Sequence, residues 1–279
     1  MNINFDGKNI QISDVRCFNL SLTLDCGQAF RWRQEKDGTW SGAAMGRKLK
    51  IRQDGDTVTL FDTTPQVYET VWKDYFDFGA DYEKLTAAIA EDAVLGDTVQ
   101  AYYGIRILRQ DSWEALCSFI FSSTNNIKRI QGFIEKISCR YGEDLGDGFY
   151  AFPTAERLAQ VGCRELRALG AGYRDVFLTD GAQKVASGEV NLEKIREMEL
   201  GQARSELMKI RGVGPKVAEC TLLFGFYRLD AFPVDRWIHR VLSLYPDGLP
   251  ECFDGCRGLA QQYMFHFARM NNIAKDVKP

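Results

Sequence analysis

The sequence predicts an α+β protein, in which a twisted antiparallel β-sheet domain at the N-terminus precedes mostly α-helical domains. Residues 1 to about 62 alternate apolar and polar side chains, as at Val58 and Leu60, and turn residues separate the short runs. From residue 63 onward, apolar residues recur at helical spacing. A glycine turn within residues 207–235 joins two of these helical segments. We therefore expect a division into residues 1–109 and 110–279.

Charge is distributed unevenly along the 279 residues, although the formal net charge is only −3. Residues 31–52 hold seven basic and two acidic side chains, net +5, whereas residues 62–97 hold nine acids and two lysines, net −7. Segments 128–140 and 204–216 each come to +3. This separation favours one basic and one acidic face. Ordinary solvated charge is the alternative interpretation.

Cysteine and histidine usage argues against a metal or cluster cofactor. The eight cysteines lack disulfide-like density, and the chain starts without a signal peptide, so we expect reduced thiols in the cytoplasm. Cys252 and Cys256 form the only close pair, short of a four-cysteine iron–sulfur set. Two histidines, His239 and His266, are too few for a zinc site. No apolar run reaches membrane-spanning length. We expect no cofactor and no membrane partner.

The elements follow from local patterns taken in order. Residues 24–32 are expected to lie within the sheet, and Asp54-Gly55-Asp56 is a turn signal. Helices are expected over residues 113–121, 127–141, 154–161 and 163–169, with a loop at 142–153. The last helix, around residues 259–265, is amphipathic and could pack back on the N-terminal lobe.

The stretch at residues 205–226 reads as helix, tight turn and helix. Its turn, Arg211-Gly212-Val213-Gly214-Pro215, has two glycines that permit positive φ, and proline suits the first position of the second helix. The free backbone amides of Gly212 to Lys216 then point outward at a helix N-terminus, where phosphate binds well. Leu-x-x-Ile-x-Gly-Val-Gly is the helix-hairpin-helix pattern, so Arg211, Gly212, Val213 and Gly214 are expected to hold a DNA backbone.

In this context the stretch resembles the helix-hairpin-helix DNA glycosylase superfamily. That superfamily carries an aspartate about twenty residues after the hairpin, usually following Pro-Val, as Asp235 does here. Lys216 matches the lysine that marks the bifunctional glycosylase/lyase members. The resemblance implies that Lys216 is the nucleophile and Asp235 its acidic partner, with no metal required, although family hairpins can hold a structural alkali cation. A solvated lysine and a plain N-cap are the structural alternatives for these two residues.

Gly27-Gln28-Ala29-Phe30-Arg31-Trp32 resembles the Gly-Gln-x-Phe-Arg-Trp segment of the 8-oxoguanine DNA glycosylase family, and this resemblance covers nearly all of the chain. It implies that the Gly27 carbonyl accepts the N7 hydrogen that 8-oxoguanine has and guanine lacks. It further implies a base pocket whose members, besides Gly27, are Cys220, Gln261, Phe265 and Trp237. In that pocket Gln261 reads the Watson–Crick edge and Phe265 stacks on the base. Trp237 stands where the family commonly has histidine.

Two further segments resemble the family's contacts around the extruded nucleotide. Residues 122–130 resemble Ser-Ser-Asn-Asn-Asn-Ile-x-Arg-Ile, in which the first Asn and the Arg contact the cytosine left unpaired. Arg129 matches and Thr124 replaces that Asn, while Asn125 and Asn126 complete the segment; capping of the next helix is the alternative. In Gly-Tyr-Arg, the resemblance implies that Tyr173 wedges into the base stack and Arg174 binds the cytosine.

Taken together, these resemblances imply a bifunctional DNA glycosylase and abasic-site lyase. The expected partner is double-stranded DNA containing oxidised guanine, bound by a monomer in the cytoplasm, nucleoid-associated in a bacterium or nuclear in a eukaryote. The enzyme would excise 8-oxoguanine, opposite cytosine, through a Lys216 Schiff base and then cleave the strand by β-elimination. Two alternatives stay open: a monofunctional alkylated-purine glycosylase, which is expected to lack Lys216, and a DNA-binding module without catalysis.

Overall fold

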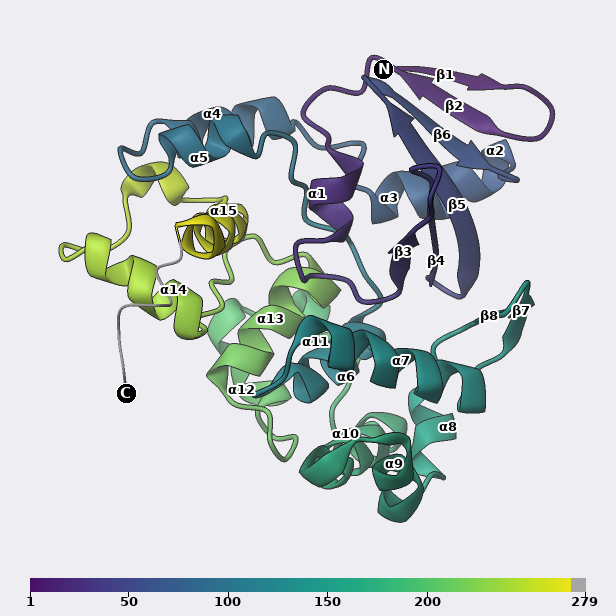
Figure 1. The fold of residues 1–279 in the computed structure, drawn as a ribbon. Helices are drawn as coiled ribbons and strands as arrows, with labels where there is room; N and C mark the ends of the chain where they lie inside the picture. The colour runs from purple at the N-terminus through teal and green to yellow at the C-terminus, as the bar shows by residue number, and fades with distance from the viewer. Residues whose placement is uncertain (272–279) are drawn as a thin grey trace.

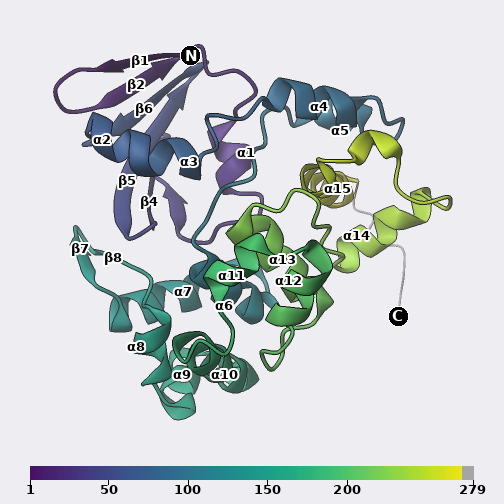
Figure 2. The ribbon, with the colours of Figure 1, turned by 180° about the vertical axis from the view of Figure 1, so that it is seen from behind.

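The computed structural model describes residues 1–271 and has a sheet at one end of a larger helical body (Figure 1). Figure 2 shows the same arrangement from behind, with α13 near the centre of the helices. The α+β fold predicted from the sequence is confirmed. Within the described residues, no helix combines the length and the apolar character needed to cross a membrane.

Six antiparallel strands form the N-terminal sheet in the order β1-β2-β6-β5-β4-β3. Their bounds are β1 Asn2–Phe5, β2 Ile10–Ser13, β3 Trp32–Gln34, β4 Trp40–Ala44, β5 Arg47–Asp54 and β6 Thr57–Phe61. Leu60 pairs with both Ile10 and Ile51, and all three side chains are fully buried, because alternate residues of each strand face one side. Aromatic residues of the following helices, among them Trp72 and Phe76, cover this side and complete a separate core.

Residues 24–32 differ from the prediction, since most of them lie outside the sheet. A short helix, α1 Leu20–Leu24, precedes a loop, and only Trp32 belongs to a strand. The Gln28 side chain holds the loop: its Nε2 donates to the carbonyls of Thr23 and Arg106, and its Oε1 accepts from the Leu108 amide. Gly27 has φ of +81°, which bends the chain. Contacts with residues about 80 positions away therefore override the local alternation.

Helices occupy most of the chain after residue 62. The first group is α2 Pro65–Val67, a π-helical turn Tyr68–Trp72, α3 Lys73–Tyr75, α4 Tyr82–Ala90 and α5 Gly96–Ala101. The second is α6 Ser112–Ser122, α7 Ile127–Tyr141, α8 Ala155–Ala159, α9 Cys163–Leu169, α10 Asp175–Ala186, α11 Leu192–Glu197, α12 Leu200–Leu207, α13 Pro215–Phe226, α14 Arg236–Val241 and α15 Arg257–Met270, with 3₁₀ turns at Gly172–Arg174, Leu242–Leu244 and Glu251–Phe253. The predicted loop at 142–153 contains a small hairpin, β7 Asp144–Gly146 and β8 Phe149–Tyr150.

One large core joins the helices and extends into the N-terminal part of the chain. The central helix α13 packs against α6 and α12, and α15 packs against α14 and α5. Buried residues of α4 and α5, such as Ile89 and Val99, belong to this helical core rather than to the sheet core. The last helix therefore lies between the two parts of the chain, where it can contribute to a site formed by both (Figure 1). The boundary at residue 109 stays a prediction.

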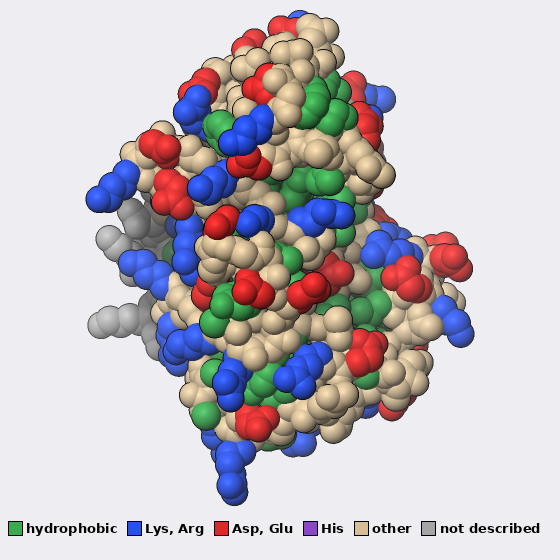
Figure 3. Space-filling view, turned by 90° about the vertical axis from the view of Figure 1, so that its right-hand side faces the viewer, with side chains coloured by type: hydrophobic (Ala, Val, Ile, Leu, Met, Phe, Trp, Pro, Cys, Tyr) green, Lys and Arg blue, Asp and Glu red, His purple; other side chains and the backbone are tan. Residues whose placement is uncertain are grey.

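Surface charge is more mixed than the local sums indicate. On the side where the sheet lies, basic and acidic side chains are interspersed (Figure 3). Ion pairs engage four of the seven basic residues in segment 31–52: Arg31 with Glu114, Arg33 with Glu135, Lys48 with Asp147 and Arg52 with Asp54. Because these partners are mostly distant in sequence, a sum over consecutive residues overstates the local field.

Candidate active site at the helix-hairpin-helix

The hairpin turn presents the N-terminus of α13 toward solvent. Gly212 has φ of +80°, whereas Gly214 has φ of −95° and serves as the N-cap, so only the first glycine requires the left-handed region. Val213 is buried and its amide donates to the Ile210 carbonyl. The prediction that this amide is free to bind phosphate is therefore wrong. Pro215 occupies the first helical turn, as predicted, and the first-turn amides of α13 have no intrahelical acceptor. The geometry suits a phosphate.

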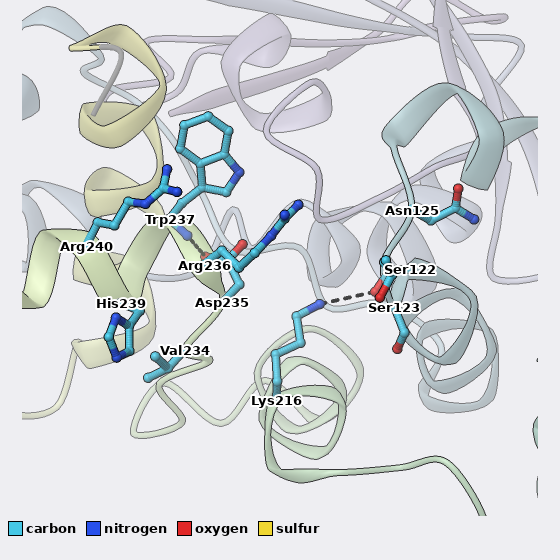
Figure 4. Close-up of a pocket in the computed structure, with 11 residues that line it drawn as sticks. Ser122, Ser123, Asn125, Lys216, Val234, Asp235, Arg236, Trp237, His239 and Arg240 are labelled. Carbon is cyan, nitrogen blue, oxygen red and sulfur yellow. Dashed lines mark hydrogen bonds between the residues drawn. The ribbon is translucent and has the colours of Figure 1, made fainter. Parts of the chain in front are cut away.

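Lys216 extends from the first turn of α13 toward the end of α6. Its Nζ donates to Ser122 Oγ at 3.1 Å, and Ser122 Oγ donates in turn to the Phe119 carbonyl at 2.8 Å. The ammonium also lies 5.5 Å from the centre of the Phe119 ring. These contacts hold a half-buried amine over the Phe119 ring at the rim of a cavity. Figure 4 shows the Lys216 side chain directed toward Ser122, a partner that the sequence did not predict.

Asp235 is the N-cap of α14 and also lines the cavity beside Lys216. Its Oδ1 accepts from the amides of Trp237 and Ile238, both at 2.9 Å. The capping alternative is thus present in the structure, and it uses one carboxylate oxygen. Within residues 1–271, Lys216 and Asp235 form no ion pair, since the Lys216 ammonium contacts Ser122 instead. Oδ1 thus orients the carboxylate, while Oδ2 accepts no hydrogen bond from the described residues.

A cavity of about 590 Å³ brings together every residue predicted for the base pocket. It is lined by Gly27, Cys220, Gln261, Phe265 and Trp237, together with Lys216 and Asp235. Such a volume accommodates a purine. A Cβ placed on Gly27 would lie 3.6 Å from Ile127 and 4.0 Å from the Phe265 ring, so the glycine keeps this wall open. Burial raises the pKa of the Cys220 thiol to about 11 against the opposing charge of Lys216, so the thiol is neutral at physiological pH.

A second cavity of about 650 Å³ adjoins the first and shares Lys216 and Asp235 with it. Its walls include Ser123 and Thr124 from the loop after α6. Figure 4 shows Arg236, His239 and Arg240 of α14 on the opposite side. Lys216 and Asp235 line both cavities, so they lie where the compartment with Gly27 and Phe265 meets the compartment with His239 and Arg240. This arrangement fits a sugar held between its base and its phosphate.

The loop between α6 and α7 carries strain at Thr124, whose φ is +52°. A β-branched residue seldom adopts this region, whereas asparagine does so more readily. Arg174 holds the loop in place, since its guanidinium donates to the carbonyls of Ser123 and Thr124. Asn126 caps α7 by accepting from the Arg129 amide at 3.0 Å, which confirms the structural alternative for that residue.

Of the predicted opposite-base contacts, Asn125 and Asn126 line the base cavity, whereas Arg129, Tyr173 and Arg174 do not. Tyr173 is 56% exposed and its ring meets Phe177 edge-on at 6.0 Å, as a wedge residue requires. Arg129 is exposed in the first turn of α7. Arg174 is only 6% exposed and is occupied by the loop carbonyls, so its bond to cytosine stays a prediction that requires the guanidinium to move. Arg211 is exposed, and its amide donates to Asp180 at 2.7 Å.

Several residues of the site carry no local signal in the sequence. Ser122 lies 94 positions before the lysine that it contacts, and Phe119 lines the cavity from the same helix. Gln262 lines the base cavity beside Gln261, although adjacent helical residues usually face different directions. In the sequence, two consecutive glutamines on an otherwise amphipathic helix could have indicated that Gln262 also lines the cavity.

Comparison with known proteins gives a consistent result. A sequence model described as 8-oxoguanine DNA glycosylase, N-terminal domain, matches residues 9–116. The N-glycosylase/DNA lyase OGG1 of Arabidopsis thaliana is 32% identical over 239 residues, which cover 81% of this chain and 66% of that protein. A 3-methyladenine DNA-glycosylase from Archaeoglobus fulgidus, 20% identical with a TM-score of 0.75 over 94% of this chain and 98% of its own, shares the fold.

The 8-oxoguanine glycosylase/lyase of Clostridium acetobutylicum has been solved with double-stranded DNA containing cytosine opposite 8-oxoguanine. It is 35% identical to this chain, covers 98% of it over 99% of its own length, and superposes with a TM-score of 0.92. The resemblance inferred from Gly27, Lys216 and Asp235 is thereby confirmed at the level of the family. The chain belongs to the 8-oxoguanine DNA glycosylase/lyase family.

Proposed function

We propose that this protein excises 8-oxoguanine from duplex DNA and then cleaves the strand at the abasic site. The observation that carries the proposal is that Lys216 and Asp235 lie where the base cavity meets the second cavity. The base cavity includes the residues that the family uses to recognise 8-oxoguanine, Gly27, Gln261 and Phe265. The named activities of the similar proteins are N-glycosylase and DNA lyase.

Extrusion of the nucleotide comes first, because C1′ of a stacked nucleotide cannot be reached by a side chain. The hairpin amides at the start of α13 hold the backbone, and Tyr173 fills the gap left in the stack. Loss of stacking is thus offset by contacts outside the pocket. Arg129 and Arg174 contact the unpaired cytosine, which makes cytosine the preferred opposite base.

Base excision follows by attack of the Lys216 amine on C1′ as the bond to the base breaks, and the proton that the amine releases on forming the new C–N bond passes to the departing base. Asp235 stabilises the positive charge that develops on the sugar, and its capping bonds hold the carboxylate in place. The resulting amine–sugar adduct opens to a Schiff base. Removal of a C2′ proton then expels the 3′ phosphate by β-elimination, and hydrolysis of the imine frees the lysine.

The alternatives account for less of the site. An alkylated-purine glycosylase on the same fold needs no lysine nucleophile, yet Lys216 points its amine into the cavity junction. A binding module explains the hairpin and leaves the Gly27–Phe265 pocket without a role. We place the protein wherever chromosomal DNA lies, the nucleoid of a bacterium or the nucleus of a eukaryote, and expect a monomer.

Trapping with borohydride tests the proposal directly. Duplexes with 8-oxoguanine opposite each normal base are incubated with the protein and borohydride, which reduces a Schiff base to a stable bond. We expect a covalent protein–DNA adduct, formed fastest opposite cytosine. Lys216→Gln should bind the duplex and give no adduct. Lys209→Gln is the matched control, since Lys209 lies in the same hairpin but pairs with Glu206 at the surface.

An adduct formed by Lys216→Gln would remove that lysine from the mechanism. Release of methylated purines by the wild-type protein without an adduct would favour the alkylated-purine alternative. Equal rates opposite all four bases would contradict the roles given to Arg129 and Arg174.

A further inference from the structure

Two adjacent glutamines on α15 form a chain of hydrogen bonds that ends on the backbone. Gln262 Nε2 donates to Gln261 Oε1 at 2.8 Å, and Gln261 Nε2 donates to the Pro233 carbonyl at 3.2 Å. Both side chains line the base cavity, and they are only 4% and 5% exposed. Pro233 lies two residues before Asp235 in the loop between α13 and α14, so the hydrogen bonds link the base cavity to the segment that carries Asp235.

Two contacts, one on each side of the Gln261 amide, set the direction of this chain. A carbonyl can only accept, so the Pro233 oxygen requires the NH2 of Gln261. The Gln261 oxygen must then face the other way, and Gln262 must present its own NH2 to that oxygen. Reversing the Gln261 amide would place its oxygen against the Pro233 carbonyl, and reversing the Gln262 amide would place its oxygen against Gln261 Oε1. The arrangement therefore has one self-consistent orientation.

That orientation leaves the Gln262 oxygen buried with no hydrogen-bond partner among residues 1–271. Leaving a buried acceptor unpaired destabilises a fold, and a methionine of similar shape would fill the space without that cost. Packing alone therefore does not explain a glutamine here. What the glutamine adds is a donor for the Gln261 oxygen.

We propose that Gln262 is a positioning residue that fixes the direction of the Gln261 amide and thereby selects guanine-type bases. The inference rests on the proposed role of Gln261 in reading the flipped base. A guanine-type edge offers N–H donors at N1 and at the 2-amino group, whereas an adenine-type edge has an acceptor at N1. With one lone pair of Gln261 Oε1 held by Gln262, the second faces the base as an acceptor. Without Gln262, only the Pro233 contact would hold the Gln261 amide, so the oxygen would face the base less consistently and the discrimination would weaken.

The test measures how strongly excision depends on the 2-amino group. Single-turnover excision is compared for duplexes containing 8-oxoguanine and 8-oxohypoxanthine, which lacks that group. Each excision rate is divided by the rate of borohydride trapping on a preformed abasic duplex, which contains no base to read. A general loss of folding lowers both rates together, whereas loss of amide orientation lowers only the excision rate.

Four variants separate the possibilities. Gln261→Met removes the reader, and Gln262→Met removes its support. Gln262→Glu keeps the shape but sets a carboxylate oxygen against Gln261 Oε1, so it should disturb the amide orientation that the Pro233 carbonyl alone then holds. Tyr263→Phe is the matched control, since Tyr263 is buried on the same helix and does not line the cavity.

We expect the 2-amino preference to fall about fivefold to tenfold in Gln262→Met, the size of one neutral hydrogen bond, and further in Gln262→Glu. Gln261→Met should abolish the preference, and Tyr263→Phe should keep it. A wild-type preference retained in both Gln262 variants but lost in Gln261→Met would overturn this inference alone. A preference retained in Gln261→Met would overturn the proposed role of Gln261 and this inference with it. Failure of the wild-type protein to form an adduct would refute the proposed function itself.

Discussion

Gly212 and Gly214 belong to the same hairpin but are constrained differently. Gly212 has φ of +80°, and a Cβ there would lie 2.4 Å from the Phe177 ring. Gly214 has an extended backbone, and a Cβ there would meet nothing within 4 Å. Two glycines that look equivalent in the pattern therefore have separate reasons to be present.

Alanine substitutions distinguish these reasons. Gly212→Ala should lower the free energy of unfolding by about 2 kcal/mol, because it combines left-handed strain with a clash against an aromatic ring. It should also weaken DNA binding, since the turn must move. Gly214→Ala serves as the control and should change the unfolding free energy by less than about 1 kcal/mol. Urea unfolding and binding to an uncleavable abasic duplex would check both, and similar losses in the two variants would contradict this account.

The site residues that the sequence predicted are those placed by short-range geometry or by a family pattern. Lys216 follows from its position one residue after Pro215, and the Asp235 cap follows from the helix that it starts. The Ser122 contact and the Gln28 anchor could not be predicted, because each joins residues brought together only by packing. Arg174 was predicted at the DNA interface, and its burial under the Thr124 loop depends on that same packing.

Among the elements, α15 combines a role in base recognition with a buried histidine. His266 stacks on Tyr102 of the α5 terminus at 5.1 Å and is 8% exposed. Burial lowers the pKa of His266 to about 4 from its ordinary value of 6.5, with a smaller contribution from the charge of Arg269. Neutral imidazole is therefore the form that the fold accommodates.

This shift makes the docking of α15 sensitive to acid. The stabilising contribution is fully present above the unfolded pKa of 6.5 and is lost as the pH falls through 4, because the unfolded chain binds the proton first. Over that window the wild-type protein should lose up to ~3 kcal/mol more unfolding free energy than His266→Phe, which keeps the aromatic stack. Urea unfolding at several pH values would measure the difference. Parallel pH profiles of the two proteins would exclude this role, and exposed His239→Gln should follow the wild type.

At the scale of the whole molecule, a contact at Asp77 joins the segment that follows α3 to the C-terminal end of α13. Asp77, 2% exposed, accepts from Arg109 Nε at 2.9 Å and from the hydroxyl of Tyr227, the C-terminal cap of α13. The Arg109 guanidinium lies 3.7 Å from the centre of the Tyr227 ring. The C-terminal end of α13, opposite Lys216, is thus fixed to the segment after α3 that carries Asp77.

Tyr227→Phe should lower the unfolding free energy by about 1.5–3 kcal/mol, because it removes a hydrogen bond to a buried carboxylate and leaves an oxygen unpaired. Chemical denaturation should show a lower midpoint with an unchanged slope. Tyr103→Phe, at an exposed tyrosine, is the control and should stay within about 0.5 kcal/mol of wild type. An unaltered midpoint in Tyr227→Phe would show that the two parts are held together elsewhere.

The position of α15 has a consequence for the order in which the protein acquires its abilities. A ribosome releases the hairpin, Lys216 and Asp235 before it releases residues 257–270, which supply Gln261, Gln262 and Phe265. With the roles proposed above, a nascent chain therefore contains the DNA-binding turn, Lys216 and Asp235 before it contains the α15 side chains that would contact the base. Proteolytic removal of α15 would accordingly abolish base discrimination while the hairpin stays in the chain.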